Sequence, residues 1–556
     1  MNAYTNFAEL LRDSIVRNWD LDALTDYDGA TLQYKDVARK IEKLHILFEN
    51  AGIKPGDKIA LCGRNSANWA VAFLSTLTYG AVAVPILHEF KAEQVQDIVN
   101  HSEARLLFAG DIVWPTLDAG KMPHLEGIVH IPDFMLLVSR TQALTEAREH
   151  LNELFGRKYP KFFRPEHICY REALGEEAAM INYTSGTTSN SKGVIIPYRA
   201  IWSNVAFAKG VLGEEIHIGD HVVSMLPMAH MYGMMFEFLY EFTAGCHVFF
   251  LTRIPSPKIV FKAFSEIKPR IVISVPLIIE KIIRKNVLPK LQTPSMKLLM
   301  KVPVVNDGIR ARIREQLIKA FGGNIYEVIL GGAAFNSEIE QFLHRMGFPF
   351  TVGYGSTECA PIIGYEDWKT FRPGSCGKAA PRMEVRIDSP DPQNVVGEIL
   401  VRGTNVMLGY YKNPEATAAT IDKEGWYHTG DLGVIDAEGY IYIRGRSKNM
   451  LLGANGQNIY PEEIEDKLNT LPYVSECVVI QKSEKLYALI HPDYDEFEKA
   501  GLNLSDLHAT MEANRKELNT MVAGYEQISG FKIMQQEFEK TPKRSIKRFL
   551  YENEEI

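Results

Sequence analysis

The amino-acid sequence predicts an α/β fold, with a large N-terminal α/β region of several subdomains and a small, mobile α+β C-terminal domain. A chain of 556 residues is longer than one hydrophobic core can serve. Short apolar runs alternate with helical patterns over most of the chain. This texture changes near Gly439. We therefore expect domains at residues 1–447 and 448–556.

The alternation begins near the N-terminus. Residues 1–20 have the apolar spacing of a helix, and an amphipathic helix is expected from Tyr34 to Ala51. KIALC and VAVPI are typical of buried strands, and so are four later runs bounded by glycine or proline, namely HVVSMLP, HVFFL, RIVIS and YEVIL. Residues 111–165 have no clear period, and we expect an irregular insertion there.

The C-terminal part has its own pattern. A strand, a turn and a glycine-rich loop occupy GYIYIRGRSKNMLLGANGQNIYP. A helix is expected from Pro461, followed by strands in SECVVIQKSEKLYALIHP. The basic turn from Arg446 to Lys448 is the expected joint to the larger part.

Composition excludes several classes of protein. A hydrophobic fraction of 46% and a charged fraction of 23% are ordinary for a globular chain. A net charge of -8 argues against a general nucleic-acid partner, which needs a basic surface. The six cysteines form no CxxC pair, which favours a reducing compartment. No signal peptide or membrane-spanning run is found, so we expect a cytoplasmic protein with at most a peripheral membrane contact.

A phosphate-binding loop is expected between two predicted strands, AAMINY and VIIP. The segment is YTSGTTSNSKGV. Glycines let backbone amides turn toward an anion, hydroxyls donate hydrogen bonds, and Lys192 supplies positive charge. A Walker A loop needs glycine directly before the lysine, where this chain has Ser191. The alternative is a solvated polar hairpin.

Four more motifs follow this loop along the chain: GGAAF (Gly331–Phe335), GYGSTE (Gly353–Glu358), WYHTGD (Trp426–Asp431) and GRSKNMLLGANGQNIYPEEIE (Gly445–Glu465). In order and spacing, the set resembles the signatures of the AMP-forming acyl-adenylate superfamily. That superfamily includes acyl-CoA synthetases, luciferases and the adenylation domains of peptide synthetases. The phosphate loop departs from the usual pattern at Ser189 and Ser191, where glycine and proline are commoner.

The resemblance implies an enzyme that uses ATP, Mg²⁺ and coenzyme A. Such a site must hold a carboxylate and a polyphosphate together, which requires positive charge and aimed donors. By resemblance, the phosphates contact Thr184, Ser185, Gly186, Thr187, Thr188 and Lys192. The adenine slot is formed by Gly331, Gly332, Ala333 and Tyr354, and Gly355 and Thr357 belong to the same nucleotide site. Asp431 binds the ribose hydroxyls with help from Arg446.

Three assignments have simpler alternatives. Glu358 resembles the magnesium ligand of the family, an oxygen donor that suits a hard cation, whereas an isolated glutamate forms a surface ion pair. His230, in LPMAHMYGM, resembles the residue near the reacting carboxylate, whereas an isolated histidine more often has a structural role. Asp431 resembles the ribose-binding residue of the family, whereas a lone aspartate usually faces solvent or caps a turn. The motif around each residue favours the functional interpretation.

The second half-reaction is expected to involve a rearrangement of the C-terminal domain. Lys448 occupies the hinge position of the family, so the domain rotates about it to present different groups to one carbonyl. Asn455 and Gly456 then lie where the pantetheine of coenzyme A enters, and glycine permits close approach of the thiol.

The last motif departs from the family. Its usual form resembles PKTxxGKxxR, and this chain has TPKRSIKRFL, which places Ser545 where the catalytic lysine is expected. Either Lys543 or Lys547 takes over that role, or adenylation is slow. These lysines join Lys192 and His230 as candidate catalytic residues.

The function we favour is ligation of a fatty acid, or another small carboxylic acid, to coenzyme A. An acyl carrier protein as acceptor, or release of the acyl-adenylate by a fatty acyl-AMP ligase, is the alternative. Amino-acid adenylation is disfavoured because no acidic partner for an ammonium stands out after His230. A noncatalytic nucleotide- or acyl-binding sensor is an alternative of another class. Chain length is not predicted, since one methylene contributes only about 0.8 kcal/mol.

Overall fold

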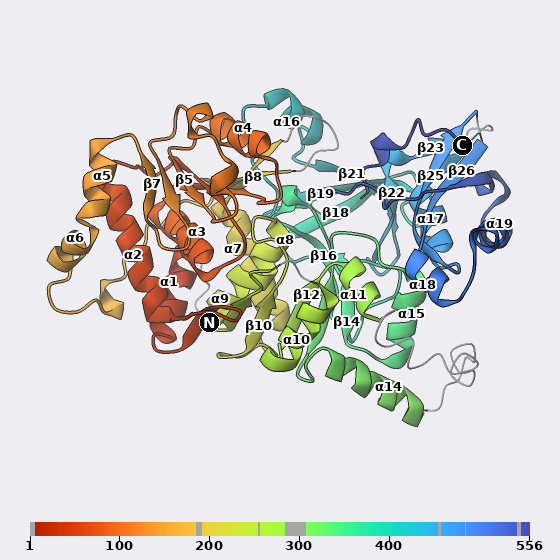
Figure 1. Cartoon of the computed structure of the whole chain (residues 1–556), viewed down its shortest axis with the longest axis horizontal. Helices are drawn as coiled ribbons and strands as arrows, with labels where there is room; N and C mark the ends of the chain where they lie inside the picture. The colour runs from red at the N-terminus through yellow and green to blue at the C-terminus, as the bar shows by residue number, and fades with distance from the viewer. Residues whose placement is uncertain are drawn as a thin grey trace.

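The computed structural model describes residues 6–184, 192–253, 256–283, 307–453, 457–483, 485–541 and 546–556. Figure 1 shows a large N-terminal part, coloured red to green, and a smaller C-terminal part in blue at one end. Parallel strands with covering helices dominate the first part. The predicted α/β fold with a small α+β C-terminal part is confirmed.

Two large sheets organise the N-terminal part. The first has eight strands in the order β20 (Gly409–Tyr410), β9 (Gly193–Pro197), β8 (Ala178–Tyr183), β4 (Val82–Ile86), β3 (Lys58–Cys62), β5 (Leu106–Ala109), β6 (Gly127–His130) and β7 (Leu136–Ser139). The second has seven, in the order β14 (Phe350–Val352), β13 (Glu327–Leu330), β12 (Ile271–Ser274), β10 (His221–Ser224), β11 (His247–Phe250), β1 (Asp22–Asp26) and β2 (Thr31–Gln33). Strands β10 to β14 pair in parallel, as their continuous apolar runs predict.

Helices cover both sheets and begin and end where capping residues allow. Asn336 caps the backbone amide of Ile339 at 3.1 Å to start α15, and Gly347, with a φ of +67°, ends it. The helices described are α1 (Phe7–Arg17), α2 (Tyr34–Asn50), α3 (Ala67–Tyr79), α4 (Ala92–Ser102), α5 (Gln142–Glu149), α6 (Leu151–Lys158), α7 (Tyr198–Leu212), α8 (Met231–Met234), α9 (Tyr240–Ala244), α10 (Pro257–Ile267), α11 (Pro276–Ile282), α14 (Asp307–Ala320) and α15 (Ser337–Met346).

The expectation of an irregular insertion at residues 111–165 is wrong. This stretch contains β6, β7, α5 and α6. Each element is short, with four residues in each strand and eight in each helix, so no window is long enough to show a clear period.

Two smaller sheets are formed by the residues that precede the C-terminal part. The first comprises β15 (Tyr354–Gly355), β16 (Ile362–Tyr365) and β17 (Lys378–Ala379), and the second is the antiparallel set β18 (Met383–Asp388), β19 (Gly397–Gly403), β21 (Tyr427–Ile435) and β22 (Ile441–Arg446). The short helix α16 (Pro414–Thr420) lies between β19 and β21 in sequence.

The strands after Lys448 form separate sheets. They are the pair β23 (Leu451–Leu452) and β24 (Asn458–Ile459), and the set β25 (Val474–Lys482), β26 (Lys485–Pro492) and β27 (Ile528–Ile533). Helices α17 (Pro461–Asn469), α18 (Tyr494–Lys499) and α19 (Leu504–Met521) accompany them, so the expected helix from Pro461 is confirmed. The boundary at residue 448 stays a prediction.

A continuous apolar helix runs through the interior of the N-terminal part. It consists of α8, the π-helical turn η4 (Met235–Leu239) and α9, and Figure 1 shows α8 and α9 in the middle of the molecule. Its side chains are buried all round, as a helix in a core requires. Its first residue follows His230, so the core fixes the position of that histidine. Over the described ranges, no helix combines the length and apolarity that crossing a membrane requires.

Candidate active site

The loops after the parallel strands of the second sheet meet at one edge. The carboxyl ends of parallel strands share an edge of a sheet, which is where ligands bind in such folds. The loop after β10 carries His230, the loop after β13 carries Gly331, and Tyr354 begins β15 two residues after the end of β14. The structure therefore brings three separate motifs to the same edge.

A buried carboxylate lies at the centre of the predicted nucleotide site. Asp431 is 5% exposed, and its Oδ2 accepts a hydrogen bond of 2.7 Å from the Tyr354 hydroxyl. Its Oδ1 lies 2.6 Å from Nε of Arg446. Asp431 and Arg446 are direct cross-strand partners in the β21–β22 hairpin, so strand register sets this ion pair.

The environment of Asp431 has opposing effects on its pKa. Burial raises the pKa of this carboxyl above its ordinary value, and the Arg446 charge and the Tyr354 hydroxyl act in the opposite direction. The carboxylate is held in one orientation by partners on both oxygens. Such an arrangement suits acceptance of hydrogen bonds from a pair of hydroxyls.

In the GGAAF loop, the backbone at Gly331 lies close to a neighbouring tyrosine. A Cβ on Gly331 would lie 3.2 Å from Cζ of Tyr232, and Gly332 has a φ of +84° that favours glycine. Gly332 and Ala333 are exposed, whereas Tyr354 is buried. Next to Tyr354, a Cβ on Gly355 would lie 2.3 Å from the carbonyl oxygen of Pro361.

Lys192 and Glu358 both contact the side chain of Tyr410. The Lys192 ammonium lies 4.7 Å from the centre of the Tyr410 ring, and the Tyr410 hydroxyl donates to Oε1 of Glu358 at 3.1 Å. Burial and the Glu358 charge both raise the pKa of Tyr410 above its ordinary value, so the hydroxyl keeps its proton. Thr357, next to Glu358, is buried in the turn η6 (Thr357–Cys359).

Only the two ends of the phosphate loop lie in the described structure. The amide of Thr184 donates to the carbonyl oxygen of Lys192 at 3.1 Å, which closes the base of the loop. The residues between, including Ser185, Gly186, Thr187 and Thr188, lie outside the described residues.

His230 caps the interior helix. Its Nδ1 accepts a hydrogen bond of 3.2 Å from the amide of Tyr232. A neutral imidazole that accepts at Nδ1 carries its proton on Nε2, which makes Nε2 a donor. A donor at this edge of the sheet suits an anionic group.

The predicted hinge lies just beyond the ribose site. Lys448 belongs to the turn η7 (Ser447–Asn449), which follows β22. In the same turn, Nδ2 of Asn449 donates to Oε1 of Glu462 on α17 at 2.6 Å. Asn455 and Gly456 lie outside the described residues.

Of the two candidate C-terminal lysines, one is described. The Lys547 ammonium forms an ion pair with Glu539, and the Lys547 amide donates to the carbonyl oxygen of Glu539 at 2.8 Å. Arg548 beside it pairs with the buried Glu465 of α17. Lys543 lies outside the described residues.

Sequence reasoning missed several residues around the site. Tyr410 carries no motif chemistry in GYYKN, and only its contact with Lys192 and Glu358 reveals it. The statement that no acid stands out after His230 is wrong, because Glu237 and Glu241 lie in that stretch, each with 0% exposure. Glu237 accepts hydrogen bonds from backbone amides rather than facing an open site.

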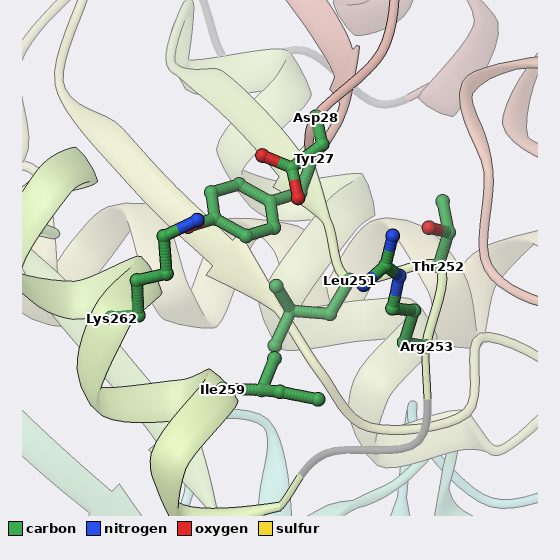
Figure 2. A pocket seen from close by; sticks show the side chains of 7 residues that line it. All are labelled: Tyr27, Asp28, Leu251, Thr252, Arg253, Ile259 and Lys262. Atoms are coloured by element: carbon green, nitrogen blue, oxygen red, sulfur yellow. The ribbon is translucent and has the colours of Figure 1, made fainter.

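Two hollows can be compared with this site. Figure 2 shows the first, a cavity of about 60 Å³ where Lys262 lies beside the Tyr27 ring and Arg253 stands apart. That volume is far below the roughly 300 Å³ at which small-molecule pockets begin. The second, of about 510 Å³, is lined by β20 and α16 and includes Tyr410. The larger hollow thus adjoins the tyrosine that contacts Lys192 and Glu358.

Comparison with known proteins finds acyl-CoA ligases among the relatives of this chain. The curated long-chain-fatty-acid–CoA ligase FadD15 of Mycobacterium bovis is 27% identical over 562 aligned positions, covering 92% of this chain and 89% of that protein. The long-chain-fatty-acid–CoA ligase of Escherichia coli O157:H7 is 26% identical and covers 86% and 83%.

Solved structures share the fold. The anthranilate CoA ligase AuaEII, in complex with anthranoyl-AMP, aligns with a TM-score of 0.79 at 21% identity, covering 99% of this chain and 97% of that one. Residues 11–411 match the family described as AMP-binding enzyme. Because that match spans well over half of the chain, the protein belongs to the AMP-binding enzyme family.

Proposed function

We propose that this protein is an ATP-dependent ligase that joins a fatty acid to coenzyme A, with release of AMP and pyrophosphate. The observation that carries the proposal is the buried Asp431 carboxylate, fixed by the Tyr354 hydroxyl and the Arg446 side chain. The curated relatives named as long-chain-fatty-acid–CoA ligases support the choice of acid and acceptor.

In the proposal, ATP binds beside the Asp431 carboxylate. The Asp431 carboxylate accepts hydrogen bonds from the ribose hydroxyls, and the Arg446 charge lowers its pKa and holds it in one orientation. Tyr354 and the Gly331–Ala333 loop flank the adenine. Thr184 and Lys192, with Ser185, Gly186, Thr187 and Thr188, bind the phosphates. The Lys192 charge offsets the repulsion between the polyphosphate and the incoming carboxylate.

Glu358 is the residue that would hold Mg²⁺. Its Oε1 accepts from Tyr410, and its carboxylate supplies the oxygen donor that Mg²⁺ prefers. Bound there, Mg²⁺ supplies charge neutralisation for the departing pyrophosphate. Tyr410 holds Glu358 near Lys192, so the chain keeps the ligand and the phosphate-binding cation side by side.

Two displacements complete the reaction. In the first, an oxygen of the fatty acid attacks the α-phosphorus of ATP and pyrophosphate leaves, while His230 donates a hydrogen bond to the carboxylate. In the second, the thiol of coenzyme A attacks the acyl carbonyl, and AMP leaves with the bonding electrons. Rotation about Lys448 exchanges the groups around this carbonyl, and Asn455 and Gly456 line the path of the thiol.

The test is a direct product assay. The purified protein is incubated with ATP, Mg²⁺ and acids from acetate to oleate, with and without coenzyme A, and AMP and acyl-CoA are measured by mass spectrometry. The proposal predicts acyl-CoA for a fatty acid. AMP or acyl-adenylate without thioester would indicate a carrier-protein acceptor or an acyl-AMP ligase. Absence of acid-dependent turnover would favour a binding sensor and refute the proposal.

A matched pair of variants ties the activity to the site. Asp431→Asn keeps the shape of the side chain and removes the charge that Arg446 pairs with. We expect at least a tenfold loss of kcat/KM for ATP, since a charged hydrogen bond contributes about 1.5–3 kcal/mol. Asp436→Asn, in the turn of the same hairpin, is the control and should retain activity.

A further inference from the structure

The loop that delivers His230 is buried and has no regular secondary structure. It runs from the end of β10 at Ser224 to the start of α8, and Met225, Leu226, Met228 and Ala229 are all below 8% exposed. A buried loop must find partners for its backbone N–H and C=O groups, because an unsatisfied polar group in the interior is destabilising.

One carboxylate supplies partners for the first half of the loop. Oε2 of Glu237 accepts hydrogen bonds from the amide of Met225 at 3.0 Å and the amide of Leu226 at 2.9 Å. It also accepts from the hydroxyl of Ser224 at 3.3 Å. Glu237 lies in the π-helical turn η4, seven residues after His230, so the carboxylate connects the interior helix to the start of the loop.

Two asparagines hold the second half. Asn65, between β3 and α3, accepts from the amide of Met228 at 2.9 Å and donates to the carbonyl oxygen of Leu226 at 2.7 Å. Asn182, on β8, donates to the carbonyl oxygen of Ala229 at 2.9 Å, next to His230. The loop is therefore held from the interior helix, from the β3–α3 connection and from β8.

Glu241 provides a contrast on the same helix. It lies four residues after Glu237 and is also 0% exposed, yet its carboxylate oxygens have no hydrogen-bond partner within the described part of the chain. Burial of a carboxylate is costly in both cases. Only Glu237 offsets part of that cost through bonds to the loop.

We infer that Glu237 is a positioning residue for adenylation, which acts with Asn65 and Asn182 to fix the Ser224–Ala229 loop and thereby place His230 against the fatty acid carboxylate. The inference rests on the proposed function for the role of His230, but the fixing of the loop does not depend on it. This role accounts for the presence of Glu237 among the apolar residues of the turn η4. A misplacement of about 1 Å at a reacting group costs on the order of a hundredfold in rate.

The test compares four variants with the wild-type chain. Glu237→Gln keeps an oxygen that accepts from both amides, Glu237→Met removes it at similar volume, and Glu241→Met is the matched control. Asn182→Ala removes the hydrogen bond to the carbonyl oxygen of Ala229, the residue before His230. Fatty acid-dependent exchange of pyrophosphate into ATP gives kcat and the KM for each substrate, and thermal unfolding reports stability.

We expect Glu237→Met and Asn182→Ala to lower kcat at least about tenfold while the KM for ATP stays unchanged. Glu237→Gln should restore most of the rate, and Glu241→Met should lower the Tm without this loss of kcat. Equal losses of kcat in Glu237→Met and Glu241→Met, in step with their Tm, would overturn the inference. If Glu237→Met does not fold, the kcat values of Asn182→Ala and Glu237→Gln still test whether the loop positions His230.

Hydrogen exchange separates this inference from the proposed function. In the wild-type protein, the amides of Met225 and Leu226 should be protected, and Glu237→Met should expose them whereas Glu241→Met should not. This readout needs no substrate. A wild-type protein without pyrophosphate exchange would refute the proposed function alone, whereas unchanged protection in Glu237→Met would overturn the role of Glu237 alone.

Discussion

Tyr354→Phe removes one hydroxyl from the nucleotide site and leaves the aromatic ring in place. That hydroxyl donates to the Asp431 carboxylate at 2.7 Å, and the carboxylate is 5% exposed. A hydrogen bond to a charged group contributes about 1.5–3 kcal/mol, and one pKa unit corresponds to about 1.36 kcal/mol. Because the Tyr354 hydroxyl lowers the pKa of Asp431, its loss is expected to raise that pKa further. This adds to the increase that burial already causes.

The direction of the change in activity depends on the ionised form of Asp431, which the proposed ribose contact requires. Ribose binding needs the Asp431 carboxylate without its proton, so a higher pKa means that binding is lost at a higher pH. The acidic limb of kcat/KM for ATP should move to higher pH in Tyr354→Phe, and on that limb kcat/KM should fall at least about tenfold, which corresponds to the lower end of the range of about 1.5–3 kcal/mol. At pH values well above both pKa values the difference should narrow.

The assay is ATP-pyrophosphate exchange from pH 5 to 9 with a fixed fatty acid. Tyr365→Phe is the matched control, because the Tyr365 hydroxyl donates to the buried Glu327 carboxylate at 2.8 Å, a similar pair that is not part of the proposed nucleotide site. Both variants should lose stability, and only Tyr354→Phe should shift the acidic limb. An unshifted limb in a folded Tyr354→Phe protein would refute the assigned role of this hydroxyl.

Three further expectations concern charges elsewhere in the chain. Burial raises the pKa of Glu241 to about 8, so between its ordinary value of 4.5 and about 8 the folded protein holds a proton that the unfolded chain releases, and stability falls as pH rises. Glu241→Gln should flatten this slope by up to about 1.4 kcal/mol per pH unit in denaturant unfolding. Glu358→Gln should raise the Mg²⁺ concentration for half-maximal pyrophosphate exchange, and an unchanged value would exclude it as the metal ligand. Lys543→Met should slow adenylation, whereas Lys547→Met should change it by less than about threefold, because the Lys547 ammonium already pairs with Glu539 in an exposed setting.

Strands β10 to β13 and the motif residues could be predicted because their signals are local. Apolar runs bounded by glycine or proline marked β10 to β13, and motif order marked Asp431, Arg446 and Tyr354. That Asp431 and Arg446 face each other depends on the register of one hairpin, which joins positions close in sequence. Short-range patterns of this kind are readable from one chain.

The supporting contacts could not be predicted because they join distant positions. Asn65 holds Met228 across 163 residues, and Tyr410 reaches Glu358 across 52. Glu237 is close in sequence to the loop it holds, yet it lies in an apolar run where a helical pattern assigns it no role. The π-helical turn that carries it leaves no periodic signature over five residues.

In the proposed mechanism, the β21–β22 hairpin allows one site to serve two half-reactions. Its first strand carries Asp431, and its second ends at Arg446, two residues before Lys448. The ion pair between Asp431 and Arg446 therefore ties the proposed ribose contact to the strand that leads into the proposed hinge. Because the pair bridges adjacent strands with a fixed register, a rotation that starts at Lys448 can leave the bound nucleotide in place. The acyl carbonyl then stays where adenylation left it, and only the groups that face it change.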